Sequence, residues 1–245
     1  MRIVVIPMAG FGTRFLEVHS DKKLTPVPPH GEPMFIHAIL KLGFSYDKII
    51  LLPRETDSIA SALHDYPQIA QLTTIVPTEG ETKGPLDTVL FARKQLEQYP
   101  DAELVICNCD QVLVWPGEWA LNWLKERGAV GGIPTIERKS KRHSYAEIDD
   151  KYPCKIKRVR EKEPISNRAT IGVYWFRHIS QFLLAADAVF AHKDIAPNGE
   201  YYVSHVYNYL NGLLLEYPLC EFWSLGEPGN FANYVQKNYL LGDDV

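Results

Sequence analysis

Short apolar runs alternate with helix-like segments through the first half of the chain, and this alternation constrains the fold most. Four runs have the length and composition of buried strands: 3–6, 49–52, 74–76 and 104–109. Between them, apolar residues recur at three- and four-residue intervals, as in amphipathic helices, over 33–42, 57–66 and 85–96. Strands joined by helices need right-handed crossovers, so this half predicts a parallel sheet covered by helices.

The second half is less regular. We expect helices at 115–127, 179–191, 202–215 and 230–241 and strands at 129–136, 154–160 and 169–176. A polar stretch, 137–151, interrupts this pattern, and no segment has the composition of a linker. The chain therefore predicts one α/β domain over 1–245, a Rossmann-like three-layer sandwich around a mixed, mostly parallel sheet.

Composition excludes several classes of protein. The 245 residues are 46% hydrophobic and 23% charged, which is typical of a globular chain and not of disordered or collagenous ones. The formal net charge of −4 argues against nucleic acid or an anionic membrane as a partner.

The cysteines and the first residues indicate a location. Cys107, Cys109, Cys154 and Cys220 lack the spacing of a zinc site, which predicts plain thiols in a reducing compartment. The first apolar run is short and meets Pro7, so we expect neither a secretory leader nor a membrane helix. The sequence thus predicts a cytoplasmic protein.

A glycine-rich segment, residues 8–15, directly follows the first predicted strand. Glycines allow close approach of a ligand to the backbone, and successive N–H groups can converge on an anion. A dinucleotide fingerprint would need a third glycine where this chain has Phe15, and a P-loop would need a Gly-Lys-Ser/Thr sequence that is missing. From these residues alone, an anion-binding loop and an ordinary tight turn both remain open.

The segments that follow, Asp21–Val27 and Gly31–Met34, make the pattern more specific. Together with the glycine segment they resemble the opening motif of the sugar-phosphate nucleotidyltransferases: Gly-x-Gly-Thr-Arg, then Pro-Lys-Pro-Leu-x-Pro-Val, then Gly-x-Pro-Met. The matching residues are Gly10, Gly12, Thr13, Arg14, Lys22, Leu24, Pro26, Val27, Gly31, Pro33 and Met34. Asp21 and Lys23 depart from the motif, because relatives usually have prolines there.

The resemblance implies a nucleotidyltransferase or glycosyltransferase-A-like fold with a nucleotide-binding half, 1–128. Arg14 would hold the leaving pyrophosphate, Lys22 the α-phosphate and Asp110 a Mg²⁺ ion. The remaining residues implied to bind the nucleotide are Ala9, Gly10, Gly12, Thr13, Thr82, Gly84 and Thr88. Without the resemblance, Asp110 would equally be a turn-initiating aspartate.

The half 129–245 would hold the sugar phosphate. Glu161, Lys162 and the strand containing Gly172 resemble the family's Glu-Lys-Pro segment and the strand after it, although Glu163 is inserted here. Read alone, this segment would be a solvated edge strand. Asn198–Tyr202 resembles a segment near the sugar site, and helix capping by Asn198 explains it nearly as well.

Ser224 stands where relatives have a second metal-binding aspartate. Either Mg²⁺ relies on Asp110, phosphates and water, or Glu227 contributes, or catalysis is impaired. The basic run 138–142 is better explained as a solvated loop, because acidic residues surround it.

The implied activity is nucleotidyl transfer from a nucleoside triphosphate to a sugar 1-phosphate, giving a nucleotide-sugar and pyrophosphate for surface polysaccharides. Two alternatives are a same-fold enzyme for a non-sugar phosphate and a catalytically impaired nucleotide-binding protein with a regulatory role. A homo-oligomer is a candidate assembly.

Overall fold

The computed structural model describes residues 1–15, 19–54, 58–140, 142–219 and 221–240. In these residues a ten-stranded sheet runs in the order β10-β9-β11-β8-β12-β6-β1-β4-β5, with β13 beside β8. Its strands are β1 Arg2–Met8, β4 Lys48–Pro53, β5 Thr73–Ile75, β6 Glu103–Cys107, β8 Ala129–Glu137, β9 Ser144–Ile148, β10 Ile156–Glu161, β11 Arg168–Thr170, β12 Val173–Phe176 and β13 Leu213–Pro218. Two short ribbons pair β2 Pro26–Val27 with β3 Glu32–Pro33, and β7 Gln111–Val114 with β14 Glu221–Ser224.

The sheet is mixed, as the sequence predicts. Strands β5, β4, β1 and β6 are all parallel, with Val4 opposite Ile49 on one side and Val105 on the other. Strand β12 runs antiparallel between β6 and β8, and β13 joins β8 in parallel. The carboxyl ends of β1 and β6 therefore meet at one edge of the sheet, where ligands bind in open α/β folds.

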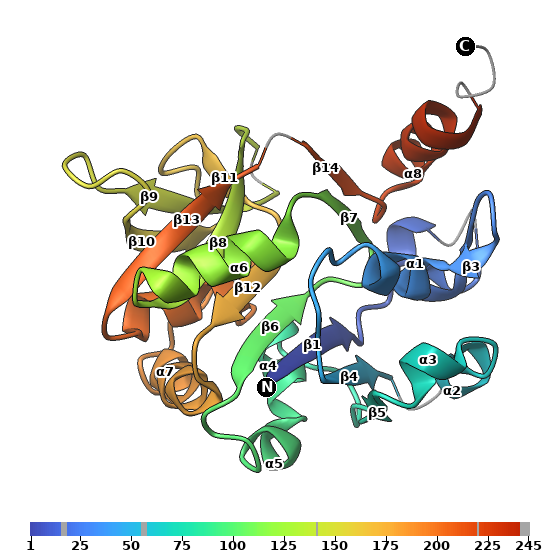
Figure 1. Ribbon diagram of the computed structural model, residues 1–245, viewed down its shortest axis with the longest axis horizontal. Helices are drawn as coiled ribbons and strands as arrows, with labels where there is room; N and C mark the ends of the chain where they lie inside the picture. The colour runs from blue at the N-terminus through green and yellow to red at the C-terminus, as the bar shows by residue number, and fades with distance from the viewer. Residues whose placement is uncertain (16–18, 55–57, 141, 220, 241–245) are drawn as a thin grey trace.

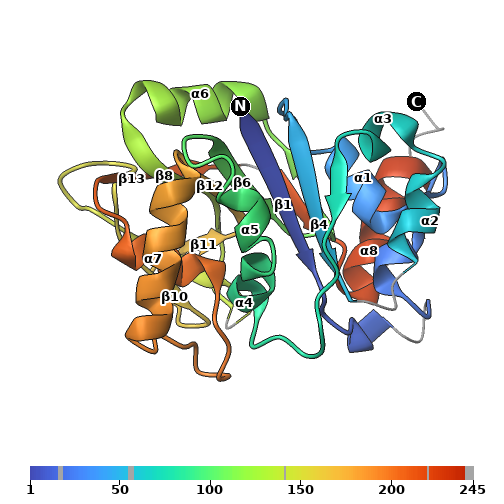
Figure 2. The same cartoon turned by 90° about the horizontal axis from the view of Figure 1, so that it is seen from below.

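Helices cover both faces, so the predicted three-layer α/β architecture is confirmed. The helices are α1 Met34–Leu40, α2 Ile59–Leu63, α3 Pro67–Ala70, α4 Pro85–Leu90, α5 Arg93–Leu96, α6 Gly117–Glu126, α7 Ile179–Ala191 and α8 Pro228–Val235, with 3-10 turns η1 Thr13–Phe15, η2 Lys22–Leu24 and η3 Val203–Tyr209 and a π turn η4 Gln236–Leu240. One core joins α4, α5, α7 and η3 to the sheet, and another joins α1, α2, α3 and α6 to the opposite face. Figure 2 shows α6 and α7 on opposite sides of the sheet.

In the first half, the helix expected over 85–96 is two helices, α4 and α5, separated by a turn at Phe91 and Ala92. The other main differences from the sequence prediction lie in the second half. The helix expected over 202–215 is wrong in its later part: η3 ends at Tyr209 and β13 begins at Leu213. The apolar residues of η3 pack into the core under the sheet, and those of β13 belong to a parallel strand of the sheet. Both elements are rich in apolar residues, so periodicity alone does not distinguish the helical turn from the strand. The strand expected over 169–176 is two strands, because the left-handed Gly172 (φ 80°) breaks it. The polar stretch 137–151 contains β9, whose Tyr145 and Ala146 are fully buried.

The last helix returns to the first part of the chain. Figure 1 shows α8 beside α1, and a hydrogen bond of 2.8 Å between the Tyr234 hydroxyl and Nε2 of His37 spans 197 positions. A third apolar core lies here, where Phe15, Val27 and Leu225 pack together and the β7–β14 ribbon adds Val112. This core fixes the glycine segment relative to the segment around Ser224.

Two other features of the described chain are its helix lengths and its cysteines. None of its helices has the length and apolar character needed to cross a bilayer. Cys107, Cys109 and Cys154 are free thiols, and burial raises the pKa of Cys109 to about 11, while Cys220 lies outside the described residues.

Candidate functional site

A cavity of about 790 Å³ opens where β1 and β6 end, and both halves of the chain line it. From the first half come Lys22, Asn108 and Asp110. The second half contributes Glu161 and Lys162, together with Gly172, Tyr202 and the segment from Ser224 to Glu227. The sequence places these residues far apart, and the sheet order brings them to one site.

Lys22 and Asp110 form an ion pair in this cavity. Lys22 Nζ donates to Asp110 Oδ2 at 2.7 Å, and both side chains are less than one-fifth exposed. Two glycines allow this approach. A Cβ on Gly12 (φ 60°) would lie 3.1 Å from Lys22 Cβ, and one on Gly226 would lie 2.4 Å from Asp110 Oδ2. The pair is thus packed between the glycine segment and the segment before α8.

Asn108 and Gly172 shape the floor beside the pair. The Asn108 N–H donates to the Gly172 carbonyl at 3.2 Å, which joins the end of β6 to the break before β12. A Cβ on Gly172 would lie 2.0 Å from Asn108 Nδ2, and its φ of 80° disfavours any other residue. The structure brings the predicted Gly172 and Asp110 together through Asn108.

Glu161 is the buried carboxyl of the cavity, with 4% exposure. The Ser144 and Ser204 hydroxyls both donate to its Oε2, the latter at 3.1 Å. Burial raises the pKa of Glu161, and the two hydroxyls oppose this in part. Because the serines hold one oxygen, the carboxyl has a fixed orientation, and we expect Oε1 to be the oxygen offered to a ligand.

Lys162 adopts a backbone conformation that is rare for a side-chain-bearing residue. Its φ of 59° lies in the left-handed region, which costs about 1 kcal/mol for a residue with a Cβ. Its N–H donates to the His143 carbonyl at 2.9 Å, and its Nζ donates to the Tyr202 hydroxyl at 2.8 Å. The inserted Glu163 therefore leaves Lys162 in the cavity.

Tyr202 is a cavity residue that the sequence analysis did not single out by itself, although the segment 198–202 was noted. Its hydroxyl donates to Glu200 at 2.5 Å and accepts from Asn198 at 3.1 Å. Asn198 thus positions a tyrosine and makes no helix cap, since η3 begins only after Tyr202. Burial and Glu200 raise the pKa of Tyr202, which keeps the phenol neutral.

The basic run 138–142 is not simply a solvated loop. Arg138, Arg142 and the following His143 all line the cavity, although both arginines are exposed. Arg142 Nη1 donates to both carboxylate oxygens of Glu227, at 2.6 and 2.8 Å. The described residues of the run form a mostly exposed loop, as predicted, but the acidic partner of Arg142 lies 85 positions away and is not one of its neighbours in the sequence.

The glycine segment lies beside the cavity and does not line it, apart from its neighbour Pro7. Ala9 is buried, while Gly10 and Thr13 are exposed at the end of β1. Arg14 lies in η1, but its side chain falls outside the described part of the chain.

The segment with Thr82, Gly84 and Thr88, which the resemblance implies binds the nucleotide, is held by contacts within itself and with Tyr201. The Thr82 and Thr88 hydroxyls lie 2.8 Å apart, and the left-handed Gly84 (φ 114°) would place a Cβ 2.6 Å from the Tyr201 carbonyl. The Tyr201 N–H donates to the Lys83 carbonyl at 2.8 Å. The loop is therefore fixed to the chain next to Tyr202, and Pro85 is its residue in the cavity.

The donors near Asp110 fit a particular kind of metal site. No group of three or more His, Cys, Asp or Glu side chains in the described ranges could hold an ion alone. Mg²⁺ commonly takes one or two carboxylates and completes its shell with phosphate oxygens and water. Asp110 supplies one carboxylate, while Glu227 is held by Arg142, and Ser224 is paired with Gln111 in the β7–β14 ribbon. This set fits an ion that arrives with a triphosphate.

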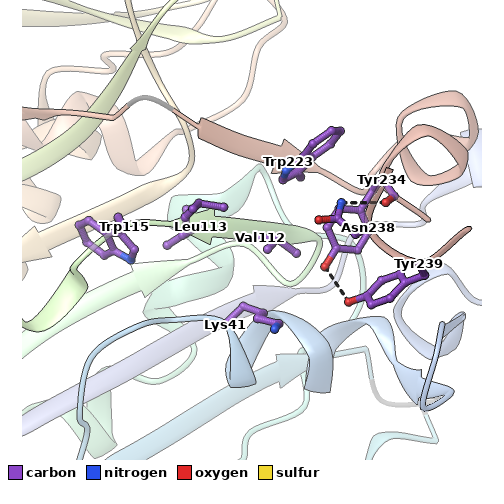
Figure 3. A pocket seen from close by; sticks show the side chains of 9 residues that line it. Lys41, Val112, Leu113, Trp115, Trp223, Tyr234, Asn238 and Tyr239 are labelled. Carbon is purple, nitrogen blue, oxygen red and sulfur yellow. Dashed lines mark hydrogen bonds between the residues drawn. The ribbon is translucent and has the colours of Figure 1, made fainter. Parts of the chain in front are cut away.

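A second cavity, of about 490 Å³, lies between the β7–β14 ribbon and the last helix (Figure 3). Trp115 and Trp223 contribute its aromatic surface, and Lys41 is its cation. The Tyr239 side chain closes one end, with its hydroxyl 3.2 Å from that of Tyr234. Its residues are distinct from those around Asp110.

Comparisons with known proteins identify the family of the chain. Residues 3–210 match the family model described as nucleotidyl transferase. A search of curated protein sequences gives no match.

Solved structures show the same fold at low identity. A nucleoside-diphosphate-sugar pyrophosphorylase from Vibrio cholerae RC9 has a TM-score of 0.77 and 22% identity, covering 95% of this chain and 99% of that one. A protein assigned as a glucose-1-phosphate thymidylyltransferase from Bacillus anthracis, solved with sucrose, has a TM-score of 0.76 and 17% identity, covering 100% and 96%. A UDP-glucose pyrophosphorylase solved with UDP-glucose has a TM-score of 0.71 and 15% identity, covering 97% and 99%.

Proposed function

Because this chain belongs to the nucleotidyl transferase family, we propose that it transfers a nucleoside monophosphate from a nucleoside triphosphate to a sugar 1-phosphate, releasing pyrophosphate. The family match over residues 3–210 supports the class of reaction. The observation that carries the proposal is that Lys22 and Asp110 line the same cavity as Glu161 and Lys162. Two anionic reactants need such an arrangement of cations from two sides.

The reaction needs no covalent intermediate and no general base. The acceptor phosphate is largely ionised at neutral pH and attacks the α-phosphorus of the triphosphate directly. The oxygen–phosphorus bond to the leaving pyrophosphate breaks as the new one forms. Catalysis then depends on in-line positioning and on stabilising charge in the transition state.

Each site residue would have a separate role in positioning and charge stabilisation. Lys22, released from Asp110 when the triphosphate enters, would neutralise the α-phosphate, and Arg14 would hold the pyrophosphate. The glycine segment 10–13 would approach the phosphates through its backbone. Glu161 would accept hydrogen bonds from the hydroxyls of the acceptor, and Lys162 would bind its phosphate.

Mg²⁺ fits at Asp110, together with oxygens of the triphosphate. When bound, the ion supplies positive charge that offsets the charge of the phosphates. The ion pair with Lys22 holds the Asp110 carboxylate in position beforehand. Lys22 would then exchange a carboxylate oxygen for a phosphate oxygen.

The test is a pyrophosphate-release assay with purified protein, Mg²⁺, each common triphosphate and a panel of phosphorylated acceptors. We expect release only when a triphosphate and a sugar 1-phosphate are both present. Release with only phospho-alcohols would replace the sugar acceptor by a non-sugar one. Triphosphate binding by calorimetry without release for any acceptor would favour the regulatory alternative suggested by Ser224. A role in surface polysaccharides rests on the family resemblance alone, and the cytoplasmic location is a prediction from the cysteines and the first apolar run.

A further inference from the structure

The charges around the cavity do not cancel. Lys22 pairs with Asp110 at 2.7 Å, and Arg142 pairs with Glu227 at 2.6 Å. The remaining carboxyl in the lining, Glu161, has a raised pKa because it is buried. These groups leave two further cations in the lining, Arg138 and Lys162.

Within the described residues neither cation forms a salt bridge at 4.0 Å or less, although the charge of Lys162 acts on the neighbouring Glu161 and opposes the rise of its pKa by burial. Lys162 Nζ bonds to the neutral phenol of Tyr202 and lies 5.0 Å from the centre of its ring. Arg138 is fixed through its backbone, since its N–H donates to the Asn167 carbonyl at 3.0 Å just beyond the end of β8. Arg138 therefore lines the cavity from an anchored backbone position.

His143 connects the two cations. Its carbonyl accepts the Lys162 N–H at 2.9 Å. Burial is the main cause that lowers the pKa of the His143 ring, and the positive charge of Arg138 is the second. Arg138 therefore lies close enough to the ring to act on it electrostatically. Arg138 and Lys162 thus border the same residue, and both line the cavity that also contains Lys22 and Asp110.

We propose that Arg138 is a second binding group for the phosphate of the acceptor and acts together with Lys162, which makes a phosphate-monoester dianion the preferred acceptor. This inference rests on the proposed function. A phosphate monoester carries a charge of about −1.5 to −2 at pH 7, and the positive charges of Arg138 and Lys162 together would offset it. The planar fork of arginine also fits two phosphate oxygens at once.

The adjacent Lys139 provides a matched control. It is exposed and does not line the cavity, so Lys139→Ala removes the same formal charge from the same segment. In steady-state assays, Arg138→Ala should raise the KM for the acceptor about 10-fold or more, because a charge-assisted hydrogen bond is lost. The KM for the triphosphate and the thermal midpoint should stay unchanged, and Arg138→Lys should recover part of the loss.

The pH dependence provides a second readout. The dianion forms above the second phosphate pKa, near 6, so the wild-type KM for the acceptor should fall as pH rises through this value. In Arg138→Ala this fall should be weaker. Equal acceptor KM values and pH profiles for Arg138→Ala and Lys139→Ala would overturn the inference while leaving the proposed function intact.

If the wild-type protein releases no pyrophosphate with any acceptor, the proposed function fails. The inference is then tested by calorimetric titration with inorganic phosphate. Weaker phosphate binding by Arg138→Ala than by Lys139→Ala would support an anion site at Arg138. Equal binding by the two variants would overturn it.

Discussion

Nζ of Lys22 lies 2.7 Å from Oδ2 of Asp110, although 88 positions separate the two residues. Lys22 is in the short turn η2, and Asp110 follows the end of β6. The pairing holds a cation and a carboxylate together at the edge of the sheet where ligands of open α/β folds bind. A triphosphate with its Mg²⁺ ion could use both groups at once.

Lys22→Met should lower kcat by about 100-fold or more, because the α-phosphate loses its positive partner in the transition state. The side chain keeps nearly the same length, so the packing against Gly12 is retained. Pyrophosphate release measures the effect. Lys94→Met, an exposed substitution on α5, should retain wild-type activity, and equal rates for both variants would contradict the role of Lys22.

Gly226→Ala should reduce activity through Asp110. The new methyl would lie 2.4 Å from Asp110 Oδ2, so the carboxylate has to move, and a displacement of about 1 Å can cost 100-fold in rate. Gly229→Ala is the control, since a Cβ there meets nothing within 4 Å. We expect kcat to fall at least about 10-fold for Gly226→Ala only, with similar thermal midpoints for the two variants. Wild-type kinetics in Gly226→Ala would contradict this view of the site.

Tyr234→Phe should destabilise the attachment of α8. The lost hydroxyl leaves Nε2 of the buried His37 without its 2.8 Å partner, which costs about 1–3 kcal/mol of unfolding free energy. Urea denaturation measures this loss. Tyr239→Phe removes only the longer, 3.2 Å contact to Tyr234 and should cost less. A smaller loss for Tyr234→Phe than for Tyr239→Phe would contradict the proposed anchor.

Stability should decrease as pH falls from 7.5 to 6. Burial lowers the pKa of His37 from its ordinary value near 6.5, while the hydrogen-bonded Glu32 opposes the shift and Lys41 and His30 add to it. In this window the unfolded chain takes up a proton that native His37 does not, which costs at most about 1.4 kcal/mol per pH unit. Burial also lowers the pKa of His143, so this residue changes the stability in the same direction.

An NMR titration of the histidine ring resonances separates these contributions. We expect His37 to be less than half protonated at pH 6.5, where an unperturbed ring is half protonated. The raised pKa of Glu161 has the opposite effect on the free energy of unfolding. As the pH falls, native Glu161 takes up a proton before the unfolded chain does, which stabilises the native state. A His37 midpoint at or above 6.5 would contradict the prediction.

Much of the fold could be predicted because the first half follows simple rules. The strands near Ile3, Ile49 and Leu104 appear where apolar runs predict them. Pro85 begins α4 as expected, since the first helical N–H needs no partner. The mixed α/β sheet follows from these elements.

The second half could not be predicted as well, because tertiary contacts determine it. Leu213–Pro218 pairs with β8, which no local period indicates. The β7–β14 ribbon joins strands more than 100 positions apart, and each is only four residues long. Periodicity is weak evidence in segments this short.

The candidate site also contains residues that the sequence predicts and residues that only tertiary contacts reveal. Lys22, Asp110, Glu161, Lys162 and Gly172 belong to recognisable motifs, and the structure places all five in the cavity lining. Tyr202 and Ser144 were missed as site residues, since their importance comes from contacts with Lys162 and Glu161. The positive φ of Lys162 also has no signal in the sequence.

The most direct test of the central claim, that cations from the two halves of the chain hold two different phosphates, is the kinetics of Lys162→Met. The account predicts that the KM for the acceptor rises about 10-fold or more while the KM for the triphosphate stays within about 2-fold. A rise in the triphosphate KM with an unchanged acceptor KM would contradict it.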